Sequence, residues 1–511
     1  MILIGGKLLT LSDFNKVLFG NQKIKVDDSA LERIRENYLF LKTFSKKKVI
    51  YGINTGFGPM APYRINDEDQ VQLQYNLIRS HCSGSGKKIE DIYARALMIC
   101  RLNSLLRGFS GIDEEIINLL VKLINEDITP VIYEHGSVGA SGDLVQLAHL
   151  ALILIGEGEV SYKGEVRPTA EVYAENGITP ISIHSREGLA IMNGTAAMCG
   201  IGVVNIIKAQ KLLSWSILAS SIINEIVESY DDHFSEELNQ VKLHVGQNHI
   251  AKQMRSILSS SNLIRRREEH LYDRHFNEDV LQDKVQEYYS LRCVPQILGP
   301  VYDTIAFAER VVIEEINSVN DNPIIDAKNN NVYHGGNFHG DYVSLEMDKV
   351  KITITKLSML AERQLNFLLN DKLNKKLPPF VNLGKLGLNF GMQGVQFTAT
   401  STVAENQTLS FPMYVHSIPN NNDNQDIVSM GFNSAMLAKK VIDNSFEVLS
   451  IELITAIQAI DYLKFEERLS DTSRSVYKKL RQIVPMFEKD TIKYKDTKNI
   501  TDYILENSPE N

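Results

Sequence analysis

The chain has 511 residues, of which 43% are hydrophobic and 23% charged, as in an ordinary soluble globular protein. Its 54 lysines and arginines stand against 63 aspartates and glutamates, so the formal net charge is −9. This acidic balance argues against a nucleic-acid groove or an anionic membrane surface as the main partner. The four cysteines show no C-x-x-C spacing and predict reduced thiols, so we expect a cytoplasmic protein.

Helical periodicity predominates along the chain. Residues 144–156 are almost wholly apolar, with Asp143 at the N-cap position and Gly156 as a stop. A helix that is apolar on all sides must be surrounded by protein, so we expect core helices here and near 189–226 rather than membrane spans. Apolar spacing predicts further long helices at residues 302–319, 342–370 and 434–463.

Strand signals are few. A short strand is predicted at the N-terminus, and residues 160–167 predict a hairpin around Lys163 and Gly164. We therefore predict a mainly α fold. A smaller mixed N-terminal domain (residues 1–215) would precede a bundle of long helices and C-terminal helices (residues 216–511).

Three loops between the helices have unusual compositions. Residues 51–58 (YGINTGFG) and 334–341 (HGGNFHGD) are rich in glycine, and residues 420–426 (NNNDNQD) contain only amides and carboxylates. Binding and catalytic groups concentrate on loops that a rigid scaffold positions. We therefore expect the functional site at these loops.

The segment GSVGASGDL (residues 136–144) directly precedes the apolar helix. A glycine turn that ends in an N-cap is its structural interpretation. A serine hydrolase does not fit, because Asp143 stands where the G-x-S-x-G motif requires glycine. A chemical interpretation is ring closure, in which the amide nitrogen of Gly142 attacks the carbonyl carbon of Ala140. Glycine removes Cβ crowding at the attacking position.

Two dehydrations, one of which removes the hydroxyl of Ser141, would complete this ring closure. The product is a methylidene-imidazolone (MIO), a strong electrophile that is made without any added cofactor. An intact chain carrying it would be lighter by two waters.

The segment ASGDL (residues 140–144) resembles the signature of the aromatic amino acid lyase family, which includes histidine, phenylalanine and tyrosine ammonia-lyases and related aminomutases. Other segments resemble the family in the same order: YGINTGFG (51–58), EGLAIMNG (187–194), QEYYSLR (286–292), NDNP (320–323) and GGNFH (335–339). The resemblance covers residues 1–480. It implies the ammonia-lyase (fumarase/aspartase-like) fold, an MIO group from Ala140, Ser141 and Gly142, and a homotetramer with shared active sites.

The resemblance also implies roles for individual residues. Tyr51 would be the base that removes the β-hydrogen, and Arg292 would clamp the substrate carboxylate with its planar fork. Asp143 would assist ring closure. The other implied site residues surround the ring or the substrate: catalytic Tyr289, and substrate-binding Ser80, His81, Asn193, Gln286, Phe338, Glu405 and Gln425. No convincing further ligands accompany His334 and His339, so we expect no metal.

The segments that bear on the choice of substrate resemble different members of the family. Ser80-His81 resembles histidine lyases, whereas NQDI (424–427) resembles phenylalanine and tyrosine lyases. His81 can hydrogen-bond a phenol or an imidazole, and phenylalanine would leave it unpaired. Residues 72–81 and 336–345 resemble bacterial tyrosine lyases. We therefore predict conversion of L-tyrosine to trans-p-coumarate, with L-histidine to urocanate as the alternative.

Two further hypotheses stay open on the sequence. One is a tyrosine 2,3-aminomutase, which would return the ammonia to the β-carbon. The other is a helical scaffold protein without catalysis. In the enzymatic hypotheses the partner is a small aromatic amino acid.

Overall fold

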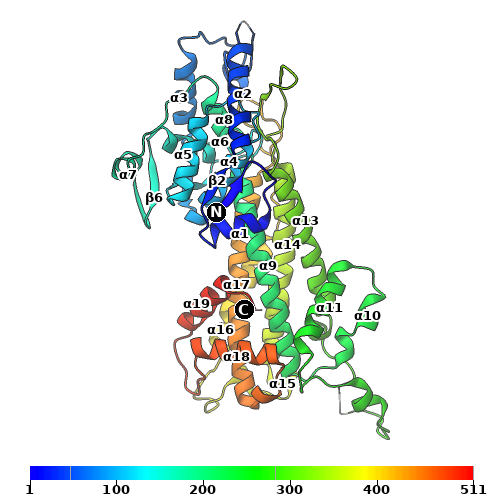
Figure 1. Ribbon diagram of the computed structural model, residues 1–511. Coiled ribbons are helices and arrows are strands. Elements are labelled where there is room, and N and C mark those ends of the chain that lie inside the picture. Colours follow the sequence, from blue (N-terminus) through cyan, green and yellow to red (C-terminus); the bar gives the residue numbers. More distant parts are fainter. Residues whose placement is uncertain (47, 282–283, 510–511) are drawn as a thin grey trace. The chain divides into compact units, whose positions relative to one another are not determined.

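The computed structural model describes residues 1–46, 48–281 and 284–509, and it is mainly helical as predicted (Figure 1). The chain divides into two compact units, each of three separate segments. The first unit comprises Met1–Ile207, Ala308–Asp348 and Pro412–Ala438, and the second Lys208–Phe307, Lys349–Phe411 and Lys439–Asn511. This division differs from the predicted single boundary at residue 215. Most of the unit boundaries fall inside long helices rather than in linkers, so no linker composition marks them in the sequence.

The first unit packs its helices around an apolar interior. Helix α4 (Asp91–Leu105) is buried from Tyr93 onward and contacts α5 (Glu114–Asn125). The remaining helices of this unit include three that pack against one another (Figure 1): α3 (Gln70–His81), α6 (Leu144–Leu154) and α8 (Glu187–Met192). The others are α1 (Leu11–Leu18), α2 (Asp28–Phe44), α7 (Thr169–Glu175) and the 3-10 turn η1 (Gly58–Met60).

The described strands are short and form four small sheets in the first unit. β1 (Ile2–Ile4) pairs in parallel with β2 (Ile24–Val26), which confirms the predicted N-terminal strand. The predicted hairpin is also confirmed, because β6 (Glu159–Tyr162) pairs with β7 (Glu165–Pro168) across Lys163 and Gly164. The remaining strands are β3 (Ser85–Lys88), β4 (Thr129–Pro130), β5 (Tyr133–His135), β8 (Ile324–Asp326) and β9 (Asn331–Tyr333).

Four long helices dominate the chain: α9 (Ala196–Ile226), α13 (Val294–Ile316), α14 (Asp341–Leu369) and α17 (Gly431–Leu463). The helices predicted from 342 and from 434 match α14 and α17 closely. The helix predicted from 302 begins earlier, at Val294, and contains Pro300. Apolar periodicity thus located these helices, but it did not predict where α13 starts.

The rest of the second unit consists of shorter helices and turns: η2 (Asp231–Phe234), α10 (Glu236–Gln240), α11 (Val245–Leu258), η3 (Glu268–Tyr272), α12 (Tyr289–Arg292), α15 (Asp371–Asn374), η4 (Pro379–Val381), α16 (Gln393–Leu409), η5 (Glu466–Arg468), α18 (Asp471–Ile483) and α19 (Lys493–Glu506). α18 is strongly amphipathic, with its apolar side buried at Val476, Tyr477 and Leu480.

Helix α9 is the one described helix that is long and apolar enough to cross a membrane, judged by length and composition. In its most apolar stretch, 83% of the residues are buried within the protein. A helix covered by protein on all sides behaves as a core helix. The predicted burial of this stretch is therefore confirmed.

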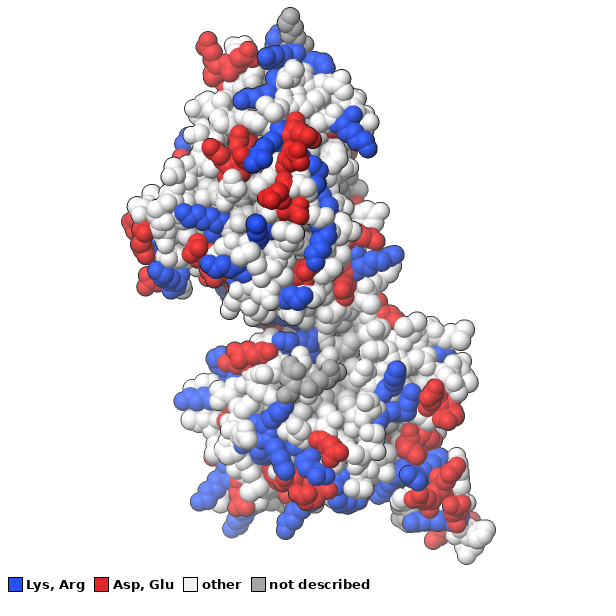
Figure 2. Space-filling view, in the orientation of Figure 1, with Lys and Arg blue, Asp and Glu red and all other residues white. Residues whose placement is uncertain are grey.

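The visible surface carries both signs of charge. Figure 2 shows lysine and arginine interspersed with aspartate and glutamate, without a broad basic field on this face. The face drawn in Figure 2 therefore has no continuous basic patch of the kind that binds a phosphate backbone.

Candidate active site

A cavity of about 960 Å³ in the first unit collects many of the predicted site residues. Its wall includes Tyr51, Ser80, His81, Ser141, Asn193, Phe338 and Gln425. These side chains come from α3, from the end of α8 and from four separate loops. Ala140 and Gly142 flank Ser141 in the chain, so the predicted ring-forming segment also lies at this cavity.

Residues 139–142 form a tight bend in front of α6. Gly139 and Gly142 have left-handed φ angles of 75° and 70°. A Cβ on Gly142 would lie 2.2 Å from the carbonyl oxygen of Gly194, so this position requires glycine. The Gly139 carbonyl accepts hydrogen bonds from the Gly340 amide (3.1 Å) and the Ser429 hydroxyl (3.0 Å). Three other parts of the chain therefore fix the bend.

Ser141 is bonded at both its side chain and its carbonyl. Gln425 Nε2 donates to Ser141 Oγ at 2.8 Å, and Asn193 Nδ2 donates to Ser141 O at 2.9 Å. Asn193 Oδ1 is buried and has no hydrogen-bond partner within the described residues. An unpaired buried acceptor costs about 1–3 kcal/mol. This oxygen is therefore a point where a bound molecule would gain a hydrogen bond.

Asp143 stands at the N-terminus of α6, but its side chain does not cap that helix. Its carboxylate accepts hydrogen bonds from Ser137 Oγ (2.7 Å) and from the Met198 amide (2.8 Å). The predicted N-cap bond is thus absent, because the unpaired amides in the first turn of α9 take the carboxylate instead. Burial raises the pKa of Asp143 to about 6, although both hydrogen bonds lower it.

One face of α3 forms a wall of the cavity. It presents Leu73, Asn76, Leu77, Ser80 and His81, which are spaced at i, i+3, i+4, i+7 and i+8. His81 Nδ1 lies 2.9 Å from the Leu77 carbonyl oxygen and 3.0 Å from Ser80 Oγ. Because a carbonyl oxygen can only accept, Nδ1 carries a proton, and in the neutral ring Nε2 is an acceptor.

Tyr51 lies on the glycine-rich loop that borders the cavity. Its hydroxyl oxygen accepts a hydrogen bond from the Gly58 amide at 3.0 Å. Its ring meets the ring of Phe57 edge-on, with centroids 6.1 Å apart. The loop thus folds back on itself and fixes the phenol.

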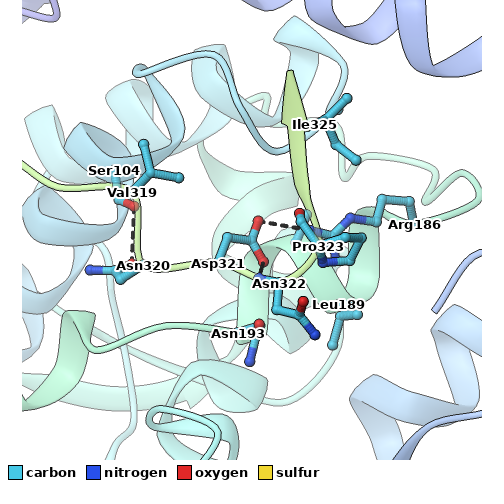
Figure 3. Close-up of polar contacts among 12 residues, drawn as sticks. Ser104, Arg186, Leu189, Asn193, Val319, Asn320, Asp321, Asn322, Pro323 and Ile325 are labelled. Carbon is cyan, nitrogen blue, oxygen red and sulfur yellow. Dashed lines mark hydrogen bonds and ion pairs between the residues drawn. The ribbon is translucent and has the colours of Figure 1, made fainter. Parts of the chain in front are cut away.

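The Asn-Asp-Asn-Pro turn (residues 320–323) lies beside Leu189 and Asn193 (Figure 3). Asp321 and Arg186 form an ion pair at 2.9 Å, and both side chains are fully buried. The next residue, Asn322, lines the cavity beside Leu189 and Asn193. The buried pair therefore sets the position of this part of the wall.

Four predicted site residues belong to the second unit and do not line this cavity: Gln286, Tyr289, Arg292 and Glu405. Arg292 Nη1 donates to the Glu287 carbonyl at 2.8 Å, and its guanidinium lies 4.7 Å from the Tyr289 ring centroid. Tyr289 is 70% exposed. Glu405 accepts a hydrogen bond from Asn444 at 2.6 Å.

Several cavity residues were not singled out from the sequence: Met60, Tyr63, Asn76, Leu189, Asn322, Asn421 and Asn424. Asn322 lies in the NDNP motif, and Asn421 and Asn424 lie in the amide-rich run. The composition of these two segments could therefore have predicted that these three residues line the site. Asn76 could have been found from its helical spacing to Ser80. Tyr63 has no such signal.

Within residues 1–46, 48–281 and 284–509, no three histidine, cysteine, aspartate or glutamate side chains are grouped so as to hold a metal ion. His339 contacts the Asp341 carboxylate at 3.4 Å. His334 instead accepts a backbone hydrogen bond.

Comparisons with known proteins identify the family of the chain. The model of the aromatic amino acid lyase family matches residues 9–482. The chain is 40% identical to a tyrosine 2,3-aminomutase of Myxococcus sp. (strain Mx-B0), over 93% of this chain and 92% of that protein. It is 37% identical to the histidine ammonia-lyase of Bacillus subtilis (strain 168), over 99% and 97%.

A solved structure has the same fold. The tyrosine aminomutase of Streptomyces globisporus superposes with a TM-score of 0.94 at 35% identity, covering 99% of this chain and 96% of that one. The sequence and structural likenesses both extend over nearly the whole chain. The chain therefore belongs to the aromatic amino acid lyase family and is a carbon–nitrogen lyase.

Proposed function

We propose that the protein eliminates ammonia from L-tyrosine to give trans-p-coumarate, using a methylidene-imidazolone formed from Ala140, Ser141 and Gly142. The bend at these residues carries the proposal. Gly142 has a left-handed φ and no room for a side chain against Gly194, and its nitrogen is the atom that ring closure requires. Once formed, the group supplies an electrophile, which ordinary side chains lack.

The residues around the bend fit this group. Gln425 donates to the Ser141 hydroxyl, the group that must leave as water. Asn193 donates to the Ser141 carbonyl and keeps a buried oxygen unpaired. Donors that are fixed before the reaction cost no reorganisation during it. These contacts hold the segment without blocking the cavity side.

Tyr51 supplies the base in this proposal. The β-hydrogen of an amino acid is barely acidic, and a positioned base contributes roughly 10²- to 10⁴-fold to rate. The Gly58 amide donates to Tyr51 Oη. A donor at this oxygen stabilises it when it is deprotonated.

Recognition of the phenol rests on His81. In the neutral ring its Nε2 is an acceptor without a protein partner in the described parts of the chain, so it can accept a hydrogen bond from the hydroxyl of tyrosine. Phenylalanine would leave this acceptor unpaired. The similarity to tyrosine 2,3-aminomutases supports tyrosine as the substrate.

A tyrosine 2,3-aminomutase is the second candidate, favoured by the 40% identity to enzymes of that name. A histidine ammonia-lyase is the alternative for the substrate, because an imidazole N–H can also donate to His81 Nε2 and the chain is 37% identical to such an enzyme. Both alternatives use the same cavity.

We further propose a homotetramer in which residues 286–292 and Glu405 of one subunit complete the cavity of another. The exposure of Tyr289 supports this, as does α16, whose outer face carries Gly394, Thr398 and Ser401 beside Phe397, which is 67% exposed. Small residues on one face of a helix let another helix approach closely, and the ring of Phe397 is apolar surface that a contact between subunits would bury. Arg292 would then meet the substrate carboxylate.

Separate incubations with L-tyrosine, L-histidine and L-phenylalanine test the proposal. We expect trans-p-coumarate from tyrosine, detected by ultraviolet absorbance and chromatography. A β-amino acid would identify the mutase, and urocanate the histidine lyase. Ser141→Ala serves as the control without ring closure. Absence of any product, in protein whose intact mass shows no loss of two waters, would refute the proposal.

A further inference from the structure

The backbone amide of Tyr51 has a side-chain partner that the proposed mechanism does not use. Tyr51 N donates to Nε2 of His334 at 3.3 Å. At the other end of the residue, the Gly58 amide donates to Tyr51 Oη at 3.0 Å. Tyr51 is therefore held at its backbone amide by His334 and at its hydroxyl by Gly58 of its own loop. Of these two partners, His334 is the one from outside the loop.

The loop that carries His334 is anchored to the cavity wall. The Gly335 amide donates to Asn322 Oδ1 at 2.9 Å, and Asn337 Nδ2 donates to the Val319 carbonyl at 3.3 Å. Strand β9 ends at Tyr333 and pairs with β8, where Tyr333 lies opposite Ile324. His334 thus lies between a paired strand, which ends at Tyr333, and a hydrogen-bonded turn, which begins at Gly335.

The base of this anchor is the buried turn of Figure 3. Asp321 pairs with Arg186 in a fully buried site, and Asn320 accepts from Ser104 Oγ at 3.1 Å and donates to Thr195 Oγ1 at 2.8 Å. Bonded and buried groups of this kind have few alternative positions. The loop that carries His334 is therefore bonded to a buried turn, which limits the positions His334 can take.

We propose that His334 is a positioning residue for the base: its neutral imidazole accepts the Tyr51 amide hydrogen and holds the phenol in the cavity. This inference rests on the proposed role of Tyr51. His334 touches neither substrate nor reacting atoms; it acts through the backbone of Tyr51. A displacement of about 1 Å in a catalytic group can cost on the order of 10²-fold in rate.

The contact requires an unprotonated Nε2. Protonation would place a second N–H against the Tyr51 amide and remove the acceptor. Partial burial, and then the positive charge of Arg186, lower the pKa of His334 below the ordinary histidine value. The neutral form is present above this lowered pKa, so the contact is intact at neutral pH and is lost as the pH falls through it.

Two substitutions distinguish the loss of the hydrogen-bond acceptor at position 334 from the loss of its titrating group. His334→Leu removes both, whereas His334→Gln keeps an acceptor oxygen at about the reach of Nε2 and does not titrate. His244→Leu, at an exposed position before α11, is the matched control. Near-ultraviolet absorbance of the ring and thermal unfolding show that each variant is loaded and folded.

Hydrogen exchange of a peptide covering Tyr51 gives a readout that needs no turnover. We expect the Tyr51 amide to exchange several-fold faster in His334→Leu, because one hydrogen bond is lost, and near the wild-type rate in His334→Gln and His244→Leu. Wild-type exchange in His334→Leu would overturn the proposal.

Turnover gives the second readout. We expect His334→Leu to lower kcat on the order of tenfold with little change in KM, because substrate contacts remain. The ratio of the His334→Gln rate to the wild-type rate should rise as the pH falls below about 6.5, the ordinary histidine pKa, since only the wild-type acceptor is lost. A pH-independent ratio would contradict the proposal. If the wild-type protein converts no amino acid, the proposed function fails, while the exchange experiment still tests His334.

Discussion

Gly142→Ala tests the close approach on which the proposed ring closure depends. The added Cβ would lie 2.2 Å from the carbonyl oxygen of Gly194 and 2.5 Å from its carbonyl carbon. Gly194 cannot retreat easily, because Arg101 and Asn320 lie behind it, within 2.4–2.5 Å of where its own Cβ would stand. Residue 142 must therefore move, and its nitrogen moves with it.

The expected cost has two parts. A left-handed non-glycine residue costs roughly 1–2 kcal/mol, and overpacking in a rigid interior costs roughly a further 1–3 kcal/mol. We therefore expect Gly142→Ala to lose about 2–5 kcal/mol of unfolding free energy, to keep the mass of the two waters and to lack near-ultraviolet absorbance and turnover.

Gly164→Ala is the matched control, because Gly164 has a left-handed φ of 82° at the hairpin turn and nothing within 4 Å of its added Cβ. It should lose only the conformational part, about 1–2 kcal/mol, and keep the ring and full activity. Intact-mass spectrometry, absorbance, urea unfolding and turnover compare the two variants. A Gly142→Ala protein with wild-type ring absorbance and turnover would refute the reasoning.

Three other predictions concern separate parts of the molecule. His81→Leu should lower kcat/KM for tyrosine roughly 10- to 100-fold, because a buried hydrogen bond is lost, and should leave turnover of phenylalanine undiminished; an unchanged tyrosine rate would remove His81 from the phenol site. Arg292→Ala should weaken substrate binding by roughly 2–5 kcal/mol, and an unchanged KM would exclude the carboxylate clamp. If active sites are shared between chains, tetramers that mix Arg292→Ala subunits with Tyr51→Phe subunits should regain activity. Arg186→Met should cost about 3–5 kcal/mol in chemical unfolding, because it removes the 2.9 Å partner of the buried Asp321 carboxylate and leaves only Arg101, at 4.0 Å; equal stability of the variant and the wild type would contradict a buried pair.

Local sequence determined the features that depend on neighbours in the chain. The helix after Asp143 ends at Leu154, and Gly156 follows with a left-handed φ of 80°, as its stop signal predicted. Lys163 and Gly164 form the predicted turn with φ angles of 52° and 82°, of which glycine adopts the second without a Cβ penalty. The combination of short motifs likewise indicated the family, since each motif is continuous in sequence.

Tertiary structure alone decided which distant groups meet. The Asp143 carboxylate bonds to the first turn of α9 rather than to its own helix, because those amides lack partners within α9. His334 meets the Tyr51 amide across 283 positions of sequence, a contact that no local pattern encodes. The compact units are discontinuous because long helices such as α9 and α14 extend past the unit boundaries. Local patterns fix backbone periodicity, whereas the pairing of polar groups depends on which surfaces the fold brings together.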